Sequence, residues 1–313
     1  MKLISGTIFA VVLVAAGLVG SCYNSNTAPV LQPLYTYEYI RDYQYAENRI
    51  FDIFPGHFLT TDLVQSVFVF VHESQVGSNT FRARLLMNPN DTTEGLPRAQ
   101  YDYMRQVPQD DYVIVNDLNR NWHYLVFNES LPEGSIGIQL MIKHTDNSVT
   151  SVGRIDQDTL QLLMVKPVTG YSPLHWTWHY MWRNAYSIPR GRFPEDLQLV
   201  IFKGPIGSEA SEGNMDVQPN DGTFLKLMGL DQYDIHGNSQ SDNILDDRSD
   251  VFRPDWGLVI FPDRYPFDTG TTFLINGQWT VPLSEKPWRI YDYTTQEERV
   301  AASRYYLRYT VAH

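Results

Sequence analysis

Cysteine is almost absent from this chain of 313 residues, which has a single one at position 22. A lone cysteine cannot form a disulfide within its own chain, so no disulfide framework can hold this fold together. Basic residues are also scarce, because 24 Lys and Arg stand against 36 Asp and Glu and give a net charge of −12. Nucleic-acid phosphates attract a basic surface, so this acidic balance argues against nucleic acid as a partner.

The sequence also lacks the short motifs that carry common catalytic chemistry. It contains no Gly-x-Ser-x-Gly elbow, no P-loop, no dinucleotide fingerprint and no His-Glu-x-x-His. Adjacent acids such as Asp110 and Asp111 are more often solvated than catalytic, and a glycosidase would need two opposed carboxylates in a cleft. We therefore expect a protein that is not an enzyme and has no catalytic residues.

Long apolar runs are missing except near the N-terminus, where residues 8–19 are apolar. This run is too short to be a convincing membrane span. It ends in the letters LVGSC, in which small residues directly precede the cysteine as they do in a bacterial lipobox. We predict a lipoprotein signal peptide over 1–21, an acylated Cys22, and a flexible tether over 22–34. The alternative is an ordinary secretory signal followed by an incidental cysteine.

The residues that follow Cys22, YNSN, include no aspartate. By analogy with the sorting of bacterial lipoproteins, this favours the outer membrane over the inner one. We therefore expect a protein that is attached to the bacterial outer membrane by its N-terminal lipid.

Short runs of β-branched and aromatic residues, separated by turn residues, predict strands along the remaining chain. Residues 160–165 suit a strand or a short helix, and helical periodicity is confined to 61–69 and 296–304. We predict an all-β fold, an antiparallel β-sandwich-like module with a few short helical turns. The predicted strands are 35–45, 66–71, 81–87, 112–115, 122–127, 136–142, 197–202 and 257–261.

An acidic loop lies between two apolar segments, 224–230 and 257–261, which we expect to be strands. Calcium takes several oxygen ligands from a loop that can curl, and Gly237 permits a tight turn here. The spacing is not that of an EF-hand, so a calcium ion would be structural and would neutralise repelling carboxylates. The alternative is a turn whose Asp and Asn side chains cap their own backbone. The predicted calcium ligands are Asp231, Asp234, Asn238, Asp242 and Asp246.

Aromatic residues are concentrated in WTWHYMWR, residues 176–183, and their alternation suggests a strand that buries one aromatic face. Core packing is the first interpretation. The alternative is a binding platform for sugar rings, formed by Trp176, Trp178 and Trp182. His175 and His179 have the spacing of a helical zinc site, but no Glu lies between them as in zinc proteases.

Several motifs follow one another in an order that identifies a resemblance. They are RNWHYL at 120–125, LLMVK at 162–166, WRNAYSI at 182–188, FLKLMGLD at 224–231, GLVIFP at 257–262 and PF at 266–267. This order resembles the repeated soluble module of the SprA/Sov proteins, the outer-membrane translocons of type IX secretion in Bacteroidota, which also serve gliding motility. The likeness extends over most of 45–310, and shared order is more specific than any single motif.

The resemblance implies a SprA-like β-rich region over 35–313, which we consider as two packed sub-domains, about 35–165 and 166–313. SprA-type chains are several times longer and repeat the module, whereas this chain has one copy, so the conduit activity does not carry over. The resemblance implies an interaction or accessory subunit with cell-envelope protein partners, or a split remnant of a larger protein. The alternative function is a carbohydrate-binding surface lipoprotein that uses the tryptophan platform.

Overall fold

The computed structural model describes residues 35–53, 58–59, 61–89, 99–118, 122–155, 159–204, 206, 223–267, 273–275, 278–280 and 290–312. The predicted signal peptide, Cys22 and the tether lie outside these residues. The chain from Tyr35 onward forms one compact unit. Its division at about residue 165 stays a prediction.

Strands dominate the described part of the chain, so the all-β prediction is confirmed. The strands are β1 (Tyr35–Arg41), β2 (Ile50–Asp52), β3 (Leu63–His72), β4 (Phe81–Leu86), β5 (Ala99–Gln106), β6 (Tyr112–Asp117), β7 (Trp122–Phe127), β8 (Ile136–Lys143), β9 (Val149–Val152), β10 (Leu160–Lys166), β11 (Ala185–Ser187), β12 (Val200–Lys203), β13 (Phe252–Arg253), β14 (Leu258–Ile260), β15 (Phe273–Ile275), β16 (Gln278–Thr280) and β17 (Tyr305–Ala312). The helices are short: α1 (Pro194–Leu197), α2 (Phe224–Leu227), α3 (Gln296–Ala302), and the 3-10 helices η1 (Gln109–Asp111), η2 (Trp178–Tyr180), η3 (Pro254–Trp256) and η4 (Ile290–Asp292).

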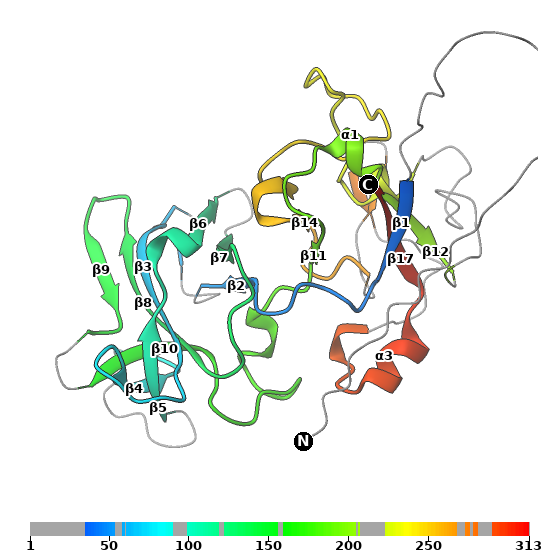
Figure 1. Cartoon of the computed structure of the whole chain (residues 1–313). Helices are drawn as coiled ribbons and strands as arrows, with labels where there is room; N and C mark the ends of the chain where they lie inside the picture. Colours follow the sequence, from blue (N-terminus) through cyan, green and yellow to red (C-terminus); the bar gives the residue numbers. More distant parts are fainter. Residues whose placement is uncertain are drawn as a thin grey trace, which may run out of the picture. The chain divides into compact units, whose positions relative to one another are not determined.

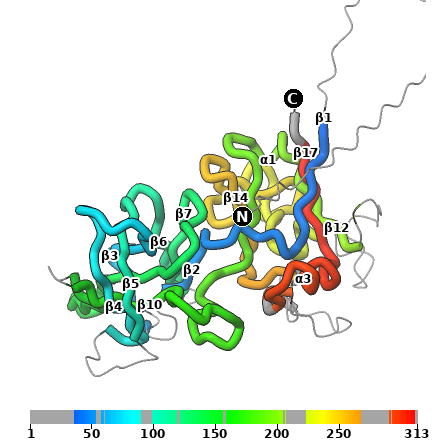
Figure 2. The backbone as a smooth tube through the Cα atoms, turned by 60° about the horizontal axis from the view of Figure 1, so that its bottom comes forward, coloured from blue at the N-terminus to red at the C-terminus, as the bar shows by residue number. Residues whose placement is uncertain are grey.

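The largest sheet closes on itself. Its strand order is β10-β4-β5-β3-β8-β9, and β10 also pairs with β8. The ring of pairings therefore runs through β10, β4, β5, β3 and β8, while β9 pairs with β8 outside the ring. The pairing of β10 with β4 is parallel and the others are antiparallel. Figures 1 and 2 show these strands gathered together.

The closed sheet has an apolar interior because its strands alternate between two faces. The side chains that pack together inside it come from four strands of the ring. At Gly137, on the fifth strand, a Cβ would lie 2.5 Å from Cδ2 of Leu85, so a larger residue would force this packed side chain to move. The interior side chains are Phe70, Ala83, Leu85, Met104, Leu160, Leu162 and Met164.

The opposite face of β3, β8 and β10 belongs to the main hydrophobic core. Val69, Ile138 and Leu163 lie in that core together with Phe51, Phe127 and residues of the C-terminal half. The remaining strands form the sheets β1-β17-β12, β2-β7-β6 and β11-β14-β13 and the pair β15-β16. Strands that are far apart in sequence thus pair, as β1 and β17 do side by side in Figures 1 and 2.

Most predicted strands are confirmed, and 160–165 is a strand, β10. The predicted helix at 296–304 is also confirmed as α3, which begins with a capping box between Thr295 and Glu298. The candidate helix over 61–69 is not formed, because residues 63–69 belong to β3, which pairs with β5 and β8.

Three further expectations about secondary structure need correction. Segment 224–230 holds helix α2 where a strand was predicted, and segment 176–183 holds η2 where an aromatic strand was predicted. The strand predicted over 197–202 starts later than expected. Helix α1 ends at Leu197, and strand β12 begins only at Val200.

Candidate functional site

The apolar segment that enters the acidic loop is a short helix with recognisable end signals. The Thr223 side chain accepts a hydrogen bond from the backbone amide of Lys226 and so caps the start of α2. Gly229 has a φ of +76°, and the Leu230 amide donates to the Leu225 carbonyl at 2.8 Å, which closes the helix end. The chain therefore turns sharply into the loop at Leu230.

Two buried carboxylates hold the base of the loop. Asp231 accepts hydrogen bonds from the backbone amides of Asp242 at 3.0 Å and Asn243 at 2.9 Å. Asp246 accepts from the backbone amide of Gln232 at 3.1 Å and from the next amide along the chain, also at 3.1 Å. Burial raises the pKa of the Asp246 carboxyl against the opposing effect of these amides. Each carboxylate thus ties one side of the loop to the other.

The tip of the loop is built from the same kind of bond. One oxygen of Asp234 accepts from the backbone amides of His236 and Asn238, both at 2.9 Å, and the other accepts from the Asn238 side chain at 2.8 Å. These bonds, led by the one from the Asn238 side chain, lower the pKa of Asp234. Asp242 accepts from two further backbone amides at 3.1 and 3.0 Å. The tip is a set of side-chain-capped turns.

The predicted calcium ligands therefore lie in one loop, and their carboxylates bind backbone amides. Within the residues that the structure describes, no three His, Cys, Asp or Glu side chains are placed to hold one metal ion. The loop borders a cavity of about 420 Å³, and the acidic side chains that line it are Glu195, Asp234, Asp242, Asp246 and Asp247. The contacts match the self-capping alternative, and a structural calcium stays a prediction.

The three tryptophans predicted as a sugar platform pack mainly inside the molecule. Trp178 and Trp182 are buried, and Trp176 is half-buried. Around Trp182, the Tyr124 ring centroid lies 4.2 Å from its own, and the Arg264 guanidinium lies 4.7 Å from it. A ring that stacks on a sugar must present an open face, so the structure does not bring the three indoles together as such a platform.

The environment of Arg183 explains why so many aromatic rings gather here. Arg183 is fully buried, and its Nη1 donates to the carbonyls of Trp178 at 3.2 Å and Met181 at 3.0 Å. Its guanidinium carbon lies 4.4 Å from the Trp178 ring centroid and 5.8 Å from that of Tyr45. A buried cation is costly unless polar groups and ring faces surround it, so these aromatics stabilise a buried charge.

The two histidines with zinc-site spacing have separate partners. Nδ1 of His175 lies 2.9 Å from Oγ1 of Thr177, whereas Nδ1 of His179 lies 3.2 Å from the Tyr265 hydroxyl. Only His179 lies in the 3-10 helix η2, and His175 precedes it, so the two histidines do not share a face of a regular α-helix.

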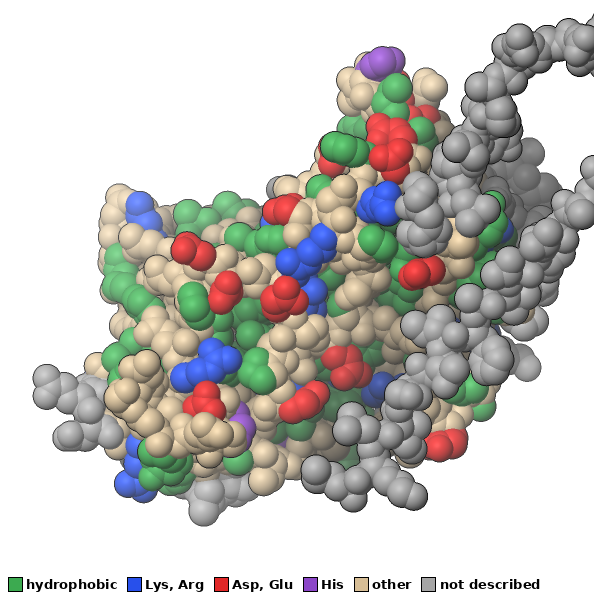
Figure 3. Space-filling view, in the orientation of Figure 1, with side chains coloured by type: hydrophobic (Ala, Val, Ile, Leu, Met, Phe, Trp, Pro, Cys, Tyr) green, Lys and Arg blue, Asp and Glu red, His purple; other side chains and the backbone are tan. Residues whose placement is uncertain are grey.

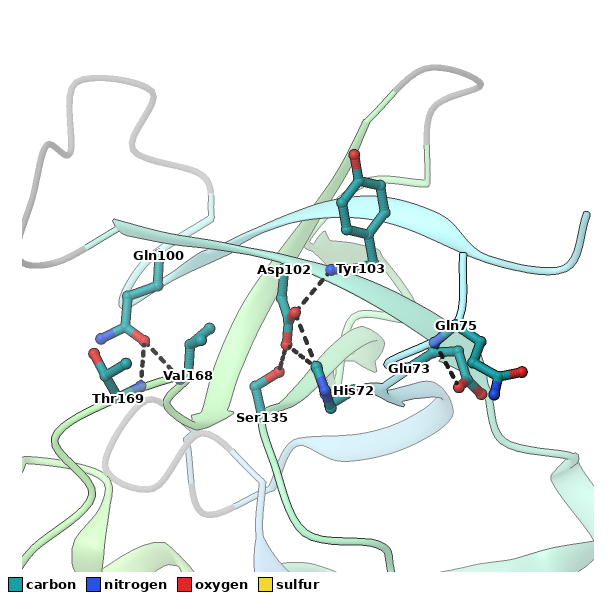
Figure 4. A network of polar contacts seen from close by, with 9 residues as sticks. All are labelled: His72, Glu73, Gln75, Gln100, Asp102, Tyr103, Ser135, Val168 and Thr169. Carbon is teal, nitrogen blue, oxygen red and sulfur yellow. Dashed lines mark hydrogen bonds and ion pairs between the residues drawn. The ribbon is translucent and has the colours of Figure 1, made fainter. Parts of the chain in front are cut away.

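A polar cluster that the sequence did not predict lies in the closed sheet, with Asp102 at its centre (Figure 4). Both carboxylate oxygens of Asp102 lie 3.0 Å from Nδ1 of His72, and the Ser135 hydroxyl donates to the same carboxylate. In a nucleophilic triad the histidine stands between acid and hydroxyl. Here the acid stands between the other two, so the cluster ties β3, β5 and the start of β8 together. His72 and Ser135 lie 30 and 33 residues from Asp102 in the sequence, so no local motif could have predicted this cluster.

Strands β4 and β5 carry a surface that we name the arginine–tyrosine face, formed by the exposed Arg82, Tyr101 and Tyr103 and the half-buried Arg84. In the strand register Arg82 lies opposite Tyr103 and Arg84 opposite Tyr101, so the four share one face. Tyr101 is 53% exposed and Tyr103 46% exposed, and the Arg82 guanidinium lies 5.5 Å from the Tyr101 ring centroid. Figure 4 shows Tyr103 pointing away from the Asp102 cluster. The alternation in 81–87 indicates the β4 half of this face, whereas β5 was not predicted.

No family model, curated protein or solved structure matches this chain. The resemblance to the SprA/Sov module therefore remains a prediction from the order of motifs. Among the described residues, none of the helices is long and apolar enough to cross a membrane. Lipidation at Cys22 concerns a residue outside the described part of the chain and also stays a prediction.

Proposed function

We propose that this protein is a non-catalytic, lipid-anchored protein of the bacterial outer membrane that binds a cell-envelope protein. It would serve as an accessory subunit in type IX secretion or gliding motility. The lipobox at Cys22 supports the location, and the motif order supports the choice of partner. The arginine–tyrosine face is the structural observation that supports the binding role.

The composition of this face suits protein binding. Tyrosine and arginine are enriched among the few residues that supply most of the binding energy at protein interfaces. Single exposed apolar residues need no explanation. This face is different because two tyrosines and two arginines are contiguous and in register across two strands.

The base of the face is rigid, which lowers the entropy lost on binding. Leu85 and Met104 belong to the same two strands and are fully buried inside the closed sheet. Asp102, between the two exposed tyrosines in sequence, is bound to His72 and Ser135. A partner would therefore meet side chains whose backbone is already in place.

The charge of the face selects among partners. In the view of Figure 3, acidic and basic side chains are interspersed with hydrophobic ones. The arginine–tyrosine face combines positive charge with aromatic rings on a chain whose net charge is −12. Arginine pairs well with carboxylates, so the face suits a partner surface that carries acidic and aromatic side chains.

The experiment compares recovered partners between variants of the tagged full chain, cross-linked in outer membranes of the native bacterium. Wild type is expected to recover a subunit of the type IX translocon. Tyr101→Ala/Tyr103→Ala is expected to reduce that recovery by about tenfold or more, because loss of a binding hot spot costs about 2 kcal/mol or more.

A matched control is available on β1. Tyr37 and Tyr39 have the same spacing on a strand and are 54% and 42% exposed. Tyr37→Ala/Tyr39→Ala should recover the same translocon subunit as wild type. Equal losses in both double variants, or recovery of no translocon subunit by wild type, would refute the proposal.

A further inference from the structure

A cavity of about 340 Å³ lies where six separate segments of the chain meet. Asp117 at the end of β6 and Tyr124 on β7 line one part of it. Asn184, just before β11, Gln232 in the loop after α2, and Arg248 at the end of the acidic loop line the remainder. No single sequence motif predicts this cavity, because its lining residues are spread from Asp117 to Pro262, more than half of the unit that begins at Tyr35.

The size of the cavity limits the ligand. Small-molecule sites in proteins measure about 300–1,000 Å³, so this cavity falls at the small end of that range. It suits a molecule with about as many atoms as one sugar ring, and not a peptide or an extended chain.

The charges around the cavity disfavour ions of either sign. Two carboxylates, Asp117 and Asp250, would repel an anion, while the Arg248 guanidinium would repel a cation. Nη2 of Arg248 already lies 2.6 Å from Oδ2 of Asp250, so an ion that binds either group must compete with this pair. A neutral molecule therefore meets the smallest electrostatic penalty.

The remaining lining supplies hydrogen-bond donors and acceptors beside aromatic groups. Asn184 and Gln232 contribute amides, Tyr124 a phenol, and Trp182 an indole. Asn184 is fully buried, its Nδ2 donates to the Phe261 carbonyl at 2.7 Å, and its Oδ1 has no hydrogen-bond partner among the described residues. A buried acceptor without a donor costs about 1–3 kcal/mol, so a hydrogen bond from a ligand hydroxyl would recover part of that cost once the lining moved to admit it.

From these observations we infer that this cavity binds a neutral polyhydroxylated ligand, a single sugar ring either free or at the end of a glycan. Hydroxyl groups both donate and accept, which matches a lining that mixes carboxylates, amides and a guanidinium. The mode of binding differs from stacking on Trp176, Trp178 and Trp182, because hydrogen bonds inside a cavity carry it. The site is independent of the arginine–tyrosine face, so either proposal can fail alone.

The test is calorimetric titration of the full chain in detergent with glucose, galactose, mannose and N-acetylglucosamine, with sodium phosphate and calcium chloride as ionic probes. At least one sugar should bind saturably with one site per chain, and neither ion should bind in this cavity. Arg248→Ala removes a lining group whose pair is exposed, so the fold should persist with an unchanged melting temperature. Asp117→Asn keeps the shape of the lining and removes one charge. Each substitution is expected to weaken the binding of the sugar by about tenfold or more.

The matched control is Arg190→Ala, which removes an equal charge from another exposed ion pair, at a residue that does not line the cavity. It should leave sugar affinity unchanged. Three results would overturn the inference: no saturable heat with any sugar up to about 20 mM, binding of phosphate that Arg248→Ala abolishes or of calcium that Asp117→Asn abolishes, or equal weakening of sugar binding in Arg190→Ala. If a sugar binds, repeating the titration with glycans that end in the same sugar distinguishes a free sugar from a glycan end, because a glycan site binds the longer molecule more tightly.

Discussion

Asp52 and Arg264 form a bidentate ion pair, although 212 residues separate them in the sequence. Nη1 of Arg264 lies 2.6 Å from Oδ2 of Asp52, and its Nη2 donates to Oδ1 at 2.9 Å. The guanidinium carbon also lies 4.6 and 4.7 Å from the ring centroids of Trp122 and Trp182. Burial raises the pKa of the Asp52 carboxyl, and Arg264 counteracts that rise. The pair joins β2 to the segment that follows β14. It therefore holds the Arg264 guanidinium against the rings of Trp122 and Trp182.

Removal of Arg264 should therefore destabilise the fold strongly. Arg264→Met keeps much of the side-chain volume but leaves the Asp52 carboxylate buried without its cation. We expect a loss of about 3–5 kcal/mol in the free energy of unfolding at pH 8, measured by urea denaturation. Arg190→Met breaks an exposed pair with Glu129 and should cost about 1 kcal/mol or less. Equal losses in the two variants would show that the buried pair has no special role.

The carboxyl of Asp42 predicts a pH dependence of stability. It is buried and accepts hydrogen bonds from the backbone amides of Arg304 at 2.8 Å and Tyr305 at 2.9 Å. Burial raises its pKa above the ordinary value, against the opposing effect of these amides. Between the unfolded value, about 3.9, and the raised folded value, the folded state holds more protons than the unfolded state. Its stabilising contribution is therefore full below pH about 3.9 and is lost as pH rises through the folded pKa.

Asp42→Asn removes this titration and keeps the shape of the side chain. Unfolding in urea across the range from pH 4 to pH 8 should show wild type gaining stability relative to Asp42→Asn as pH falls. Each unit of separation between the two pKa values contributes about 1.4 kcal/mol. Asp110→Asn, at an exposed position, is the control that should follow the wild-type curve. If the curve of Asp42→Asn ran parallel to wild type, the carboxyl would not titrate in this way.

Local patterns predicted the strands well because their information is local. The alternating Val and Phe residues of β3 and the β-branched residues of β8 define strands wherever their partners lie. The helix α2 could also have been found, because Thr223 and Gly229 are ordinary start and stop signals for a helix. Its apolar letters were read as a strand instead. The closing of the large sheet by two partners of β10 has no local signal at all.

In the candidate site, too, local features were predictable from the sequence and contacts that depend on the final fold were not. The carboxylates of the acidic loop were correctly placed together, since they are neighbours in sequence. The sequence could not predict what these carboxylates bind. The hydrogen bond from the Asn243 amide to Asp231, for example, depends on the final geometry of the turn. The burial of Trp178 and Trp182 depends on Arg183 and Arg264, and the second of these is more than 80 residues further along the chain.

Lipidation at Cys22 can be tested with one substitution. In Cys22→Ser the only thiol is gone, so cells grown with labelled palmitate should yield no labelled protein. The variant should also retain its signal peptide and migrate as a larger species. Ser25→Ala, three residues beyond the cysteine, is the control that should be labelled like wild type. Persistent labelling of Cys22→Ser would contradict the lipoprotein prediction, and an unlabelled wild type would favour an ordinary secretory signal.

The acidic loop predicts a second stability effect, which also tests the calcium prediction. Asp231 is buried and binds the amides of Asp242 and Asn243, so Asp231→Ala leaves buried donors without an acceptor. Hydrogen bonds to a charged group contribute about 1.5–3 kcal/mol, and we expect a loss of about 3 kcal/mol in urea denaturation. Asp247→Ala, at an exposed position in the same loop, should cost about 0.5 kcal/mol or less.

The loss in Asp231→Ala should be the same in a chelator as in millimolar calcium, because backbone amides are the partners of that carboxylate. A smaller loss in the chelator would mean that part of the role of Asp231 is to hold an ion. Calcium titration of wild type then decides the metal prediction by itself. Heat and a raised melting temperature that Asp234→Ala/Asp242→Ala lacks would establish a structural calcium. No heat and no shift would leave the loop as a turn held by its own backbone, since every carboxylate that calcium would need already accepts hydrogen bonds from amides.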